Sequence, residues 1–196
     1  MSSDGPVEET RRRVLEATVD LIDRVGYWSV TVDAIARASG VSKSTIYRHW
    51  SSRKALVLDA FTSDTDESTQ VADTGDAIAD LRTFLLKLAY RLNVRGAGPI
   101  MTGLISDALN DEEFAQSFRA KVIEARRHAF LQILLRGQQR GQIRTDVDLT
   151  SVVDALYGSI HHRLLMTRAP IDGQFASALT DFAQQGLAAP RPLVVA

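Results

Sequence analysis

The residues with the clearest chemistry lie between positions 41 and 56. This segment carries four basic side chains and no acidic one, with hydroxyl, phenol and imidazole groups between them. Such groups donate hydrogen bonds to phosphate oxygens, and some of them also reach the edges of bases. Because the whole chain has a net charge of −1, we expect polyanion binding to be local to this segment. The basic residues are Lys43, Arg48, Arg53 and Lys54.

Two short helices joined by a turn are predicted over residues 31–50. Thr31 is suited to cap the first helix, and Ser42 is suited to cap the second. Gly40 lies between them, where a residue that reaches positive φ without strain can make the turn. This layout is that of a helix-turn-helix, whose second helix enters the major groove of DNA.

The second helix of this motif has two different faces. Ile46 and Trp50 are four residues apart and point toward the core, as Ile35 does on the first helix. The opposite face has no acidic or large aliphatic residue and consists of Lys43, Ser44, Thr45, Tyr47, Arg48 and His49. The helix that follows this motif, capped by Ser51 or Ser52, starts near Arg53 and would aim further N–H groups and positive charge at phosphates.

At these positions the chain resembles the TetR family of bacterial transcriptional regulators. The resemblance covers about the first third of the chain. Two departures are small: Trp50 stands where the aromatic residue is usually Phe, and Arg53 stands where the basic residue is usually Lys. The matching pieces are Val14–Leu21 with Gly26-Tyr27, Thr31–Ala36, Ser39–Ser42, Ile46-Tyr47 with His49-Trp50, and Ser52-Arg53 with Leu56.

The resemblance implies roles for individual residues. Lys43 would read bases, because its ammonium suits guanine O6 and N7. Tyr47 and His49 would donate to phosphates, and Arg48 would reach either the DNA backbone or solvent. A further helix is predicted over residues 8–25. It carries three consecutive arginines, residues 11–13, which could reach phosphates or a minor groove, or form a solvated turn of that helix. The implied DNA-contact set is Thr31, Ser42, Lys43, Ser44, Thr45, Tyr47, Arg48, His49, Arg53 and Lys54.

The composition and periodicity predict an all-α soluble protein. The chain has 196 residues, of which 45% are apolar and 24% charged, and it contains no cysteine. Disulfides and thiolate metal sites are therefore excluded. We see no convincing strand and no signal peptide or membrane-length apolar run, so a cytoplasmic location is expected. About nine helices are predicted.

We expect two domains. A small three-helix helix-turn-helix domain is predicted over residues 7–67, and a larger helical domain over residues 76–196. The polar segment 64–76 would be a linker or the exposed end of a helix, and residues 95–99 break the pattern. A long helix is predicted from Asp111 to about Gly137. Its apolar stripe is Phe114, Phe118, Val122, Ala125, Ala129 and Ile133.

The resemblance implies that the second domain binds a small molecule and dimerises. The predicted dimer interface lies on one face of each of the last two predicted helices, although both faces could instead belong to one monomer's core. Its residues are Val153, Leu156, Tyr157, Ile160, Leu164, Phe175, Leu179 and Phe182. The predicted pocket for a mostly hydrophobic ligand is Phe84, Leu88, Met101, Leu104, Ile105, Phe118, Val122 and His128, although such a stripe could equally be ordinary core. His161 and His162 are further candidates for hydrogen bonds to a ligand.

Enzyme chemistry is not expected. Glu124 and His128 share a helix face, but no third metal ligand accompanies them. No glycine-rich phosphate loop or nucleophile elbow is present, and no cofactor or metal is implied. The predicted function is a homodimeric repressor that binds a palindromic DNA site and is released by a small effector. The alternatives are a DNA-binding regulator without an inducer pocket, a ligand-activated one, or a helical enzyme or partner-binding module. The expected partners are double-stranded DNA, a second copy and the effector, with no membrane.

Overall fold

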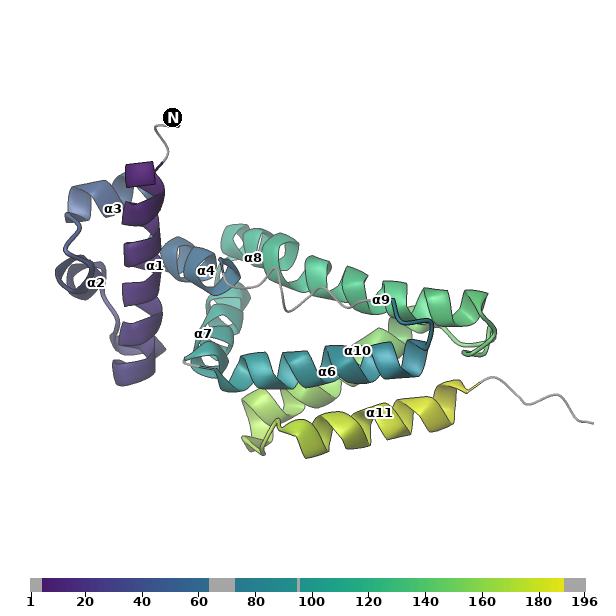
Figure 1. Cartoon of the computed structure of the whole chain (residues 1–196). Helices are drawn as coiled ribbons and strands as arrows, with labels where there is room; N and C mark the ends of the chain where they lie inside the picture. Colours follow the sequence, from purple (N-terminus) through teal and green to yellow (C-terminus); the bar gives the residue numbers. More distant parts are fainter. Residues whose placement is uncertain (1–4, 64–72, 95, 189–196) are drawn as a thin grey trace, which may run out of the picture. The chain divides into compact units, whose positions relative to one another are not determined.

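The structure, a computed structural model, describes residues 5–63, 73–94 and 96–188, and these residues are almost entirely helical (Figure 1). Within them, the only β pairing is an isolated bridge between Ile143 and Ala188. The predicted all-α fold is therefore confirmed. The α-helices are α1 (Gly5–Val25), α2 (Val32–Ser39), α3 (Lys43–His49), α4 (Arg53–Thr62), α6 (Ala77–Asn93), α7 (Ala97–Asn110), α8 (Glu112–Phe118), α9 (Glu124–Gln139), α10 (Leu149–His161) and α11 (Gly173–Leu187).

Two compact units divide the chain. The first unit comprises residues 1–67 and 92–123, and the second comprises residues 68–91 and 124–196. The first therefore holds α1–α4 together with α7 and α8, whereas we predicted that α7 and α8 would belong with the C-terminal helices. Tyr27 shows one reason: its ring lies so close to Gly103 of α7 that a Cβ on that glycine would be 2.3 Å from it. Most of the predicted linker lies outside the described residues.

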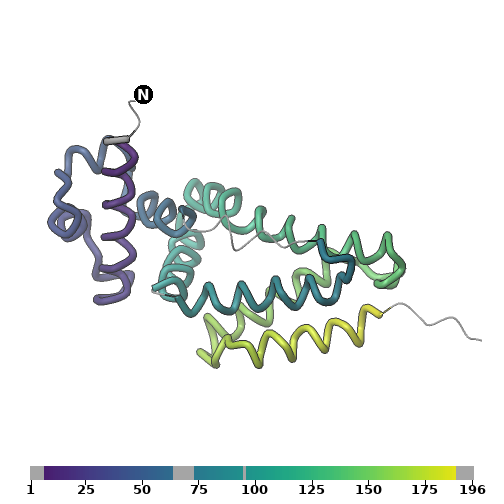
Figure 2. Tube along the Cα trace, in the orientation of Figure 1, coloured from purple at the N-terminus to yellow at the C-terminus, as the bar shows by residue number. Residues whose placement is uncertain are grey.

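Local sequence signals account for the helices of the first unit. Thr31, Ser42 and Ser52 each accept a hydrogen bond from the backbone N–H three residues later, at 3.2 Å, which caps α2, α3 and α4. Gly40 ends α2 with φ 67°, in the left-handed region where glycine is unstrained. Figure 2 shows α2 lying against α1 within this unit. The helix-turn-helix layout predicted for residues 31–50 is present.

The second unit packs around aromatic side chains. The rings of Phe84 on α6 and Phe130 on α9 have centroids 5.2 Å apart, and both residues are fully buried. Helix α11 lies beside α6, where Arg82 forms an ion pair of 2.6 Å with Asp181 (Figure 1). In the described part of the chain, no helix combines the length and the apolar character that a bilayer crossing requires.

A π-helical turn over residues 119–123 changes the predicted register of the long helix. The predicted apolar stripe continued from Val122 to Ala125 and Ala129, but Ala125 is exposed and Ala129 only half-buried. Arg126 and Phe130 are buried instead, at 4% and 0% exposure. A π turn takes up more residues than an α turn, so it rotates the following helix relative to a regular 3.6-residue pattern. The prediction was wrong at these two alanines for that reason.

Candidate nucleic-acid interface

Helix α3 presents a polar and basic face over a buried support. Ile46 and Trp50 are 1% and 7% exposed and hold the helix on the core of the first unit. Thr45 is half-buried, and the other outward side chains are exposed, including Tyr47 at 51%. The remaining exposed members are Ser42, Lys43, Ser44, Arg48 and His49. The structure therefore gathers these predicted contact residues on one exposed surface, which we call the α3 face.

The support of the α3 face is fixed by Asp59 of α4, a residue that the sequence reasoning missed. The Trp50 indole N–H donates to the Asp59 carboxylate at 2.8 Å. Arg11 of α1 donates to both oxygens of the same carboxylate at 2.9 Å. This charge-assisted pair, made by the Arg11 Nη2 group alone, and the indole hydrogen bond join α1, α4 and the end of α3. No local pattern pointed to Asp59, because its partners are 9 and 48 residues away.

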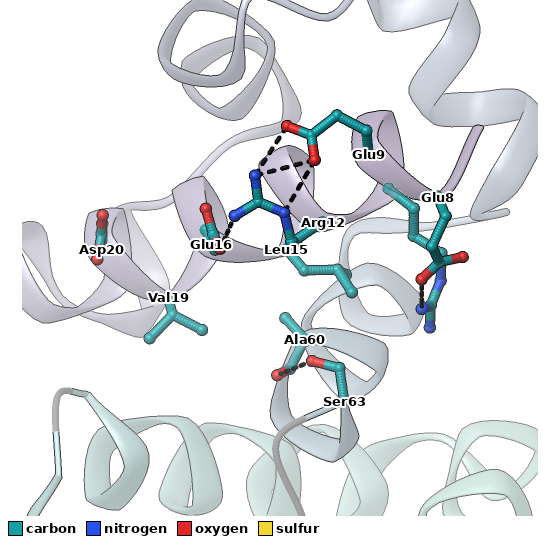
Figure 3. A pocket seen from close by; sticks show the side chains of 10 residues that line it. Glu8, Glu9, Arg12, Leu15, Glu16, Val19, Asp20, Ala60 and Ser63 are labelled. Carbon is teal, nitrogen blue, oxygen red and sulfur yellow. Dashed lines mark hydrogen bonds and ion pairs between the residues drawn. The ribbon is translucent and has the colours of Figure 1, made fainter. Parts of the chain in front are cut away.

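The three consecutive arginines of α1 all have partners within the chain. Besides the Arg11 pair with Asp59, Arg12 forms ion pairs with Glu9 at 2.8 Å and Glu16 at 2.6 Å (Figure 3). Arg13 donates to the backbone carbonyl of Ser39 at 2.5 Å, next to the turn before α3. These contacts favour a structural role for the arginine run over a direct role in DNA contact.

A groove between α1 and α4 is lined by Arg11 and Arg12 together with a larger number of acidic side chains. It has a volume of about 710 Å³. Glu8, Glu9, Glu16 and Asp20 are among its lining residues (Figure 3). Carboxylates repel phosphates, so this side of α1 is unsuited to nucleic-acid contact.

Lys43 is held on the surface by one acidic neighbour. Its ammonium lies 2.5 Å from the Asp33 carboxylate of α2, and the two side chains are 51% and 53% exposed. The hydrogen bond to Asp33 and its charge raise the pKa of Lys43 above the ordinary value, so the side chain remains cationic at neutral pH. An exposed pair of this kind contributes little stability. Lys43 can therefore exchange Asp33 for an external acceptor at small cost.

Arg53 and Lys54 of α4 are arranged differently from the α3 face. The Arg53 guanidinium donates to the Tyr27 carbonyl at 3.0 Å, lies 4.5 Å from the Tyr27 ring centroid and is 3.5 Å from Asp107 of α7. Lys54 forms an ion pair with Asp111, the N-cap residue of α8. That pair holds the pKa of the Asp111 carboxyl below its ordinary value. Both cations are already used inside the first unit, and their contact with DNA stays a prediction.

The residues of the predicted ligand pocket do not belong to one unit. Phe84 and Leu88 are buried in the second unit, whereas His128 is exposed on α9. The exposure of His128 removes the reason for choosing it as a buried polar group. The predicted pocket residues in the first unit are Met101, Leu104, Ile105, Phe118 and Val122, all of them buried except the half-buried Ile105.

The predicted dimer residues fall into two groups. Phe182 of α11 is 71% exposed and is available to a partner. The half-buried residues are Tyr157, Leu164 and Phe175. Val153, Leu156, Ile160 and Leu179 are buried within the single chain. For these four, the alternative of a monomer core accounts for their burial without a partner. Among the described residues no group of three His, Asp or Glu could hold a metal ion.

Comparisons with known proteins identify the family. The family described as "Bacterial regulatory proteins, tetR family" matches residues 14–60, and "Tetracyclin repressor-like, C-terminal domain" matches residues 71–183. The HTH-type transcriptional regulator YdeS of Bacillus subtilis is 34% identical over 93% of this chain and 91% of its own length. The DNA-binding transcriptional repressor TetR of Mycobacteroides abscessus is 30% identical over 88% of this chain and 91% of its own.

A solved structure agrees with these sequence relatives. The crystal structure of the TetR family transcription regulator SCO0332 has 36% sequence identity and a TM-score of 0.74, and the match covers 93% of this chain and 100% of that one. Its helical architecture and the helix-turn-helix of the first unit agree with the two family matches. The chain therefore belongs to the TetR family of bacterial transcriptional regulators and is a regulator rather than an enzyme.

Proposed function

We propose that the protein is a homodimeric repressor that binds a palindromic operator through the α3 face and leaves it when a small ligand binds. One observation carries the proposal: every outward side chain of α3 is polar or basic, while Ile46 and Trp50 anchor the helix. A rigid helix of this kind can enter the major groove with its N-terminal residues toward the bases. The repressor would act in the cytoplasm, where the chromosome is accessible.

In this proposal the DNA contacts divide into two kinds. Lys43 lies in the first turn of α3 and would read bases after leaving Asp33. Tyr47 and His49, together with Thr31 at the start of α2, would donate to phosphates and fix the register. The Ser44 side chain is short enough for a close approach of α3 to the groove. Arg53 and Lys54 would contribute only if they exchanged Asp107 and Asp111 for phosphates.

The dimer would form through the exposed faces of α10 and α11. On α10, Ala155 and Gly158 are exposed, and a Cβ added at Gly158 would meet nothing within 4 Å. On α11, Ala178 is exposed and Phe182 is 71% exposed. Small residues allow helices to approach closely, and a large exposed aromatic beside them can be buried by a second copy. A two-fold dimer would then match half-sites about 34 Å apart, one turn of the duplex.

Release of the protein from its operator would depend on contacts inside the first unit that connect α7 to the DNA-binding helices. Arg53 of α4 reaches Asp107 of α7, and the Tyr27 hydroxyl donates to the same carboxylate at 2.6 Å. A ligand that favoured a shifted α7 would therefore also shift α4, which carries Asp59 and supports α3. The ligand can release DNA only as far as it binds the two conformations with different affinity.

Selection of operators from random duplexes tests the proposal. We expect a palindromic consensus that the protein protects from cleavage at moderate salt. Lys43→Ala should lose about 1–3 kcal/mol of discrimination at one base position, whereas Tyr47→Phe should weaken binding to all sequences alike. Lys121→Ala and Tyr90→Phe are matched controls, since both residues are exposed and lie outside α3. The absence of any protected palindrome would rule the repressor out, and equal effects of both variants on all operators would rule out the division of contacts.

A further inference from the structure

Asp33 of α2 places a carboxylate beside the α3 face, whose own members include no acid. Its Oδ1 atom lies 2.5 Å from the Lys43 ammonium, and its side chain is 53% exposed. Phosphates repel a carboxylate, so an acid at this position weakens general DNA binding unless it gains a specific partner there. A carboxylate in the first turn of α2 also stabilises that helix, but this role needs no contact with Lys43.

The backbone on both sides of this contact is held in place. Val32 and Ile35 are buried and fix α2 on the core, and Thr31 caps its first turn. Lys43 is the first residue of α3. The N-terminal residues of a recognition helix contact base edges. A side chain that touches the Lys43 ammonium therefore lies within reach of the same base edges.

Reading a guanine would leave the Asp33 carboxylate without its cation. The Lys43 ammonium would turn to O6 and N7 of the base, and the contact would exclude water from its surroundings. A carboxylate that loses water then needs a new hydrogen-bond donor. In the major groove, the bases offer two such donors, N4 of cytosine and N6 of adenine. Arg37, exposed one turn further along α2, acts with its charge on Lys43, so this surface stays positive toward phosphates and Asp33 can approach DNA.

The spacing of the two charged groups favours a G·C pair. Guanine O6 and cytosine N4 are joined by a hydrogen bond of about 2.9 Å, close to the 2.5 Å between the Lys43 and Asp33 atoms. The ammonium donates and the carboxylate accepts, so each can face its complement on one base pair. An A·T pair also presents an acceptor beside a donor, but thymine O4 gives Lys43 one acceptor where guanine gives two.

We infer that Asp33 is a specificity-determining residue that accepts a hydrogen bond from N4 of the cytosine paired with the guanine that Lys43 reads. Two side chains from two helices thereby recognise both strands at one base pair. The inference rests on the proposed function, because it concerns the operator that the α3 face binds. It adds α2 to base recognition, whereas the proposed contact of α2, through Thr31, is to a phosphate.

Base analogues in the selected operator test the inference. The consensus should contain a G·C pair at the position where Lys43→Met relaxes the preference. In one duplex, 2-pyrimidinone, which lacks the 4-amino group, replaces that cytosine. In a second duplex, 7-deazaguanine, which lacks N7, replaces the guanine. We expect the wild-type protein to bind each duplex about tenfold more weakly than the operator. A consensus without a G·C pair at this position would overturn the inference.

Variants assign each loss to one side chain. Asp33→Ala should bind the operator and the 2-pyrimidinone duplex equally, yet still lose about tenfold on the 7-deazaguanine duplex. Lys43→Met should show the reverse pattern. If Asp33 only oriented Lys43, Asp33→Ala would lose the response to 7-deazaguanine instead, and this result would overturn the inference.

An acid outside the motif is the matched control for charge. Asp23 is exposed on α1, so Asp23→Asn removes one negative charge and should respond to both analogues as the wild-type protein does. The absence of any selected operator would overturn the proposed repressor. An operator on which the wild-type protein and Asp33→Ala respond alike to 2-pyrimidinone would overturn the role of Asp33 alone.

Discussion

Helices α3 and α4 begin with similar sequences but use their charges in opposite ways. Each has a serine cap that is followed directly by a basic residue, Lys43 in α3 and Arg53 in α4. Lys43 of α3 pairs with Asp33 on an open surface, where both side chains are about half exposed at 51% and 53%. Arg53 of α4 pairs with Asp107, and these side chains are only 25% and 18% exposed. The comparison shows that a basic first turn predicts charge, not the partner of that charge.

The partners explain the difference in role. Asp33 belongs to the neighbouring helix of the same motif, so the α3 pair is local and easily exchanged. Asp107 and Asp111 come from α7 and α8, more than fifty residues along the chain, so the α4 pairs hold the first unit together. Half-buried pairs are less screened by salt than exposed ones. We therefore expect α3 to act on an external ligand and α4 to transmit structural change.

Removing the shared support of the two helices should have the largest effect. Trp50→Ala deletes a nearly buried ring and its hydrogen bond to Asp59. We expect a loss of about 3–5 kcal/mol in the free energy of unfolding, measured by urea denaturation. Trp28→Ala is the control, because Trp28 is 64% exposed, and it should lose less than about 1 kcal/mol. Equal losses would mean that Trp50 does not anchor α3.

Removing one acid from each helix's pair tests the comparison directly. Asp107→Asn should lower the free energy of unfolding by about 1–3 kcal/mol, because Arg53 and the Tyr27 hydroxyl both lose a charged acceptor. Asp33→Asn should change it by less than about 0.5 kcal/mol. Operator binding should also become more salt-dependent in Asp107→Asn if the freed Arg53 reaches a phosphate. Similar losses of stability in both variants would contradict the difference between α3 and α4.

The pH dependence of stability should reveal the Lys54–Asp111 pair. The hydrogen bond from Lys54 lowers the pKa of Asp111 in the folded protein. The contribution of the Lys54–Asp111 pair to the free energy of unfolding is therefore fully present above the ordinary Asp pKa of about 3.9. It disappears as the pH falls through the lower pKa that Asp111 has in the folded protein. Asp111→Asn should flatten the acid limb of the stability curve, measured by thermal unfolding between pH 2 and 6. Lys54→Met should flatten it similarly, and the double variant should add nothing. Additive effects would show that the two residues act separately.

The smallest effect on stability and on operator affinity is expected from a substitution on α1. Arg12→Ala removes exposed ion pairs to Glu9 and Glu16, so the free energy of unfolding should change by less than about 0.5 kcal/mol. Operator affinity should also stay the same, because Arg12 lines the mostly acidic groove of α1 and is not part of the α3 face. A uniform loss of affinity with a reduced salt slope would instead place Arg12 on a phosphate.

The sequence by itself determined the helix-turn-helix. Capping residues, the turn glycine and the spacing of Ile46 and Trp50 act over a few residues, so the helices and their faces follow from local rules. The exposed α3 face follows from the same spacing. The resemblance based on these residues predicted the family that the comparisons then identified.

Only the tertiary structure decided which partners distant residues have. Asp59, Asp107 and Asp111 meet the basic residues of α1 and α4 across long stretches of chain, which no periodic pattern encodes. The π turn at residues 119–123 rotated α9, so that Arg126 rather than Ala125 is buried. Local hydrogen bonds and periodicity fix a helix and its faces. The packing of helices decides which residues distant in the sequence meet and which side chains become buried.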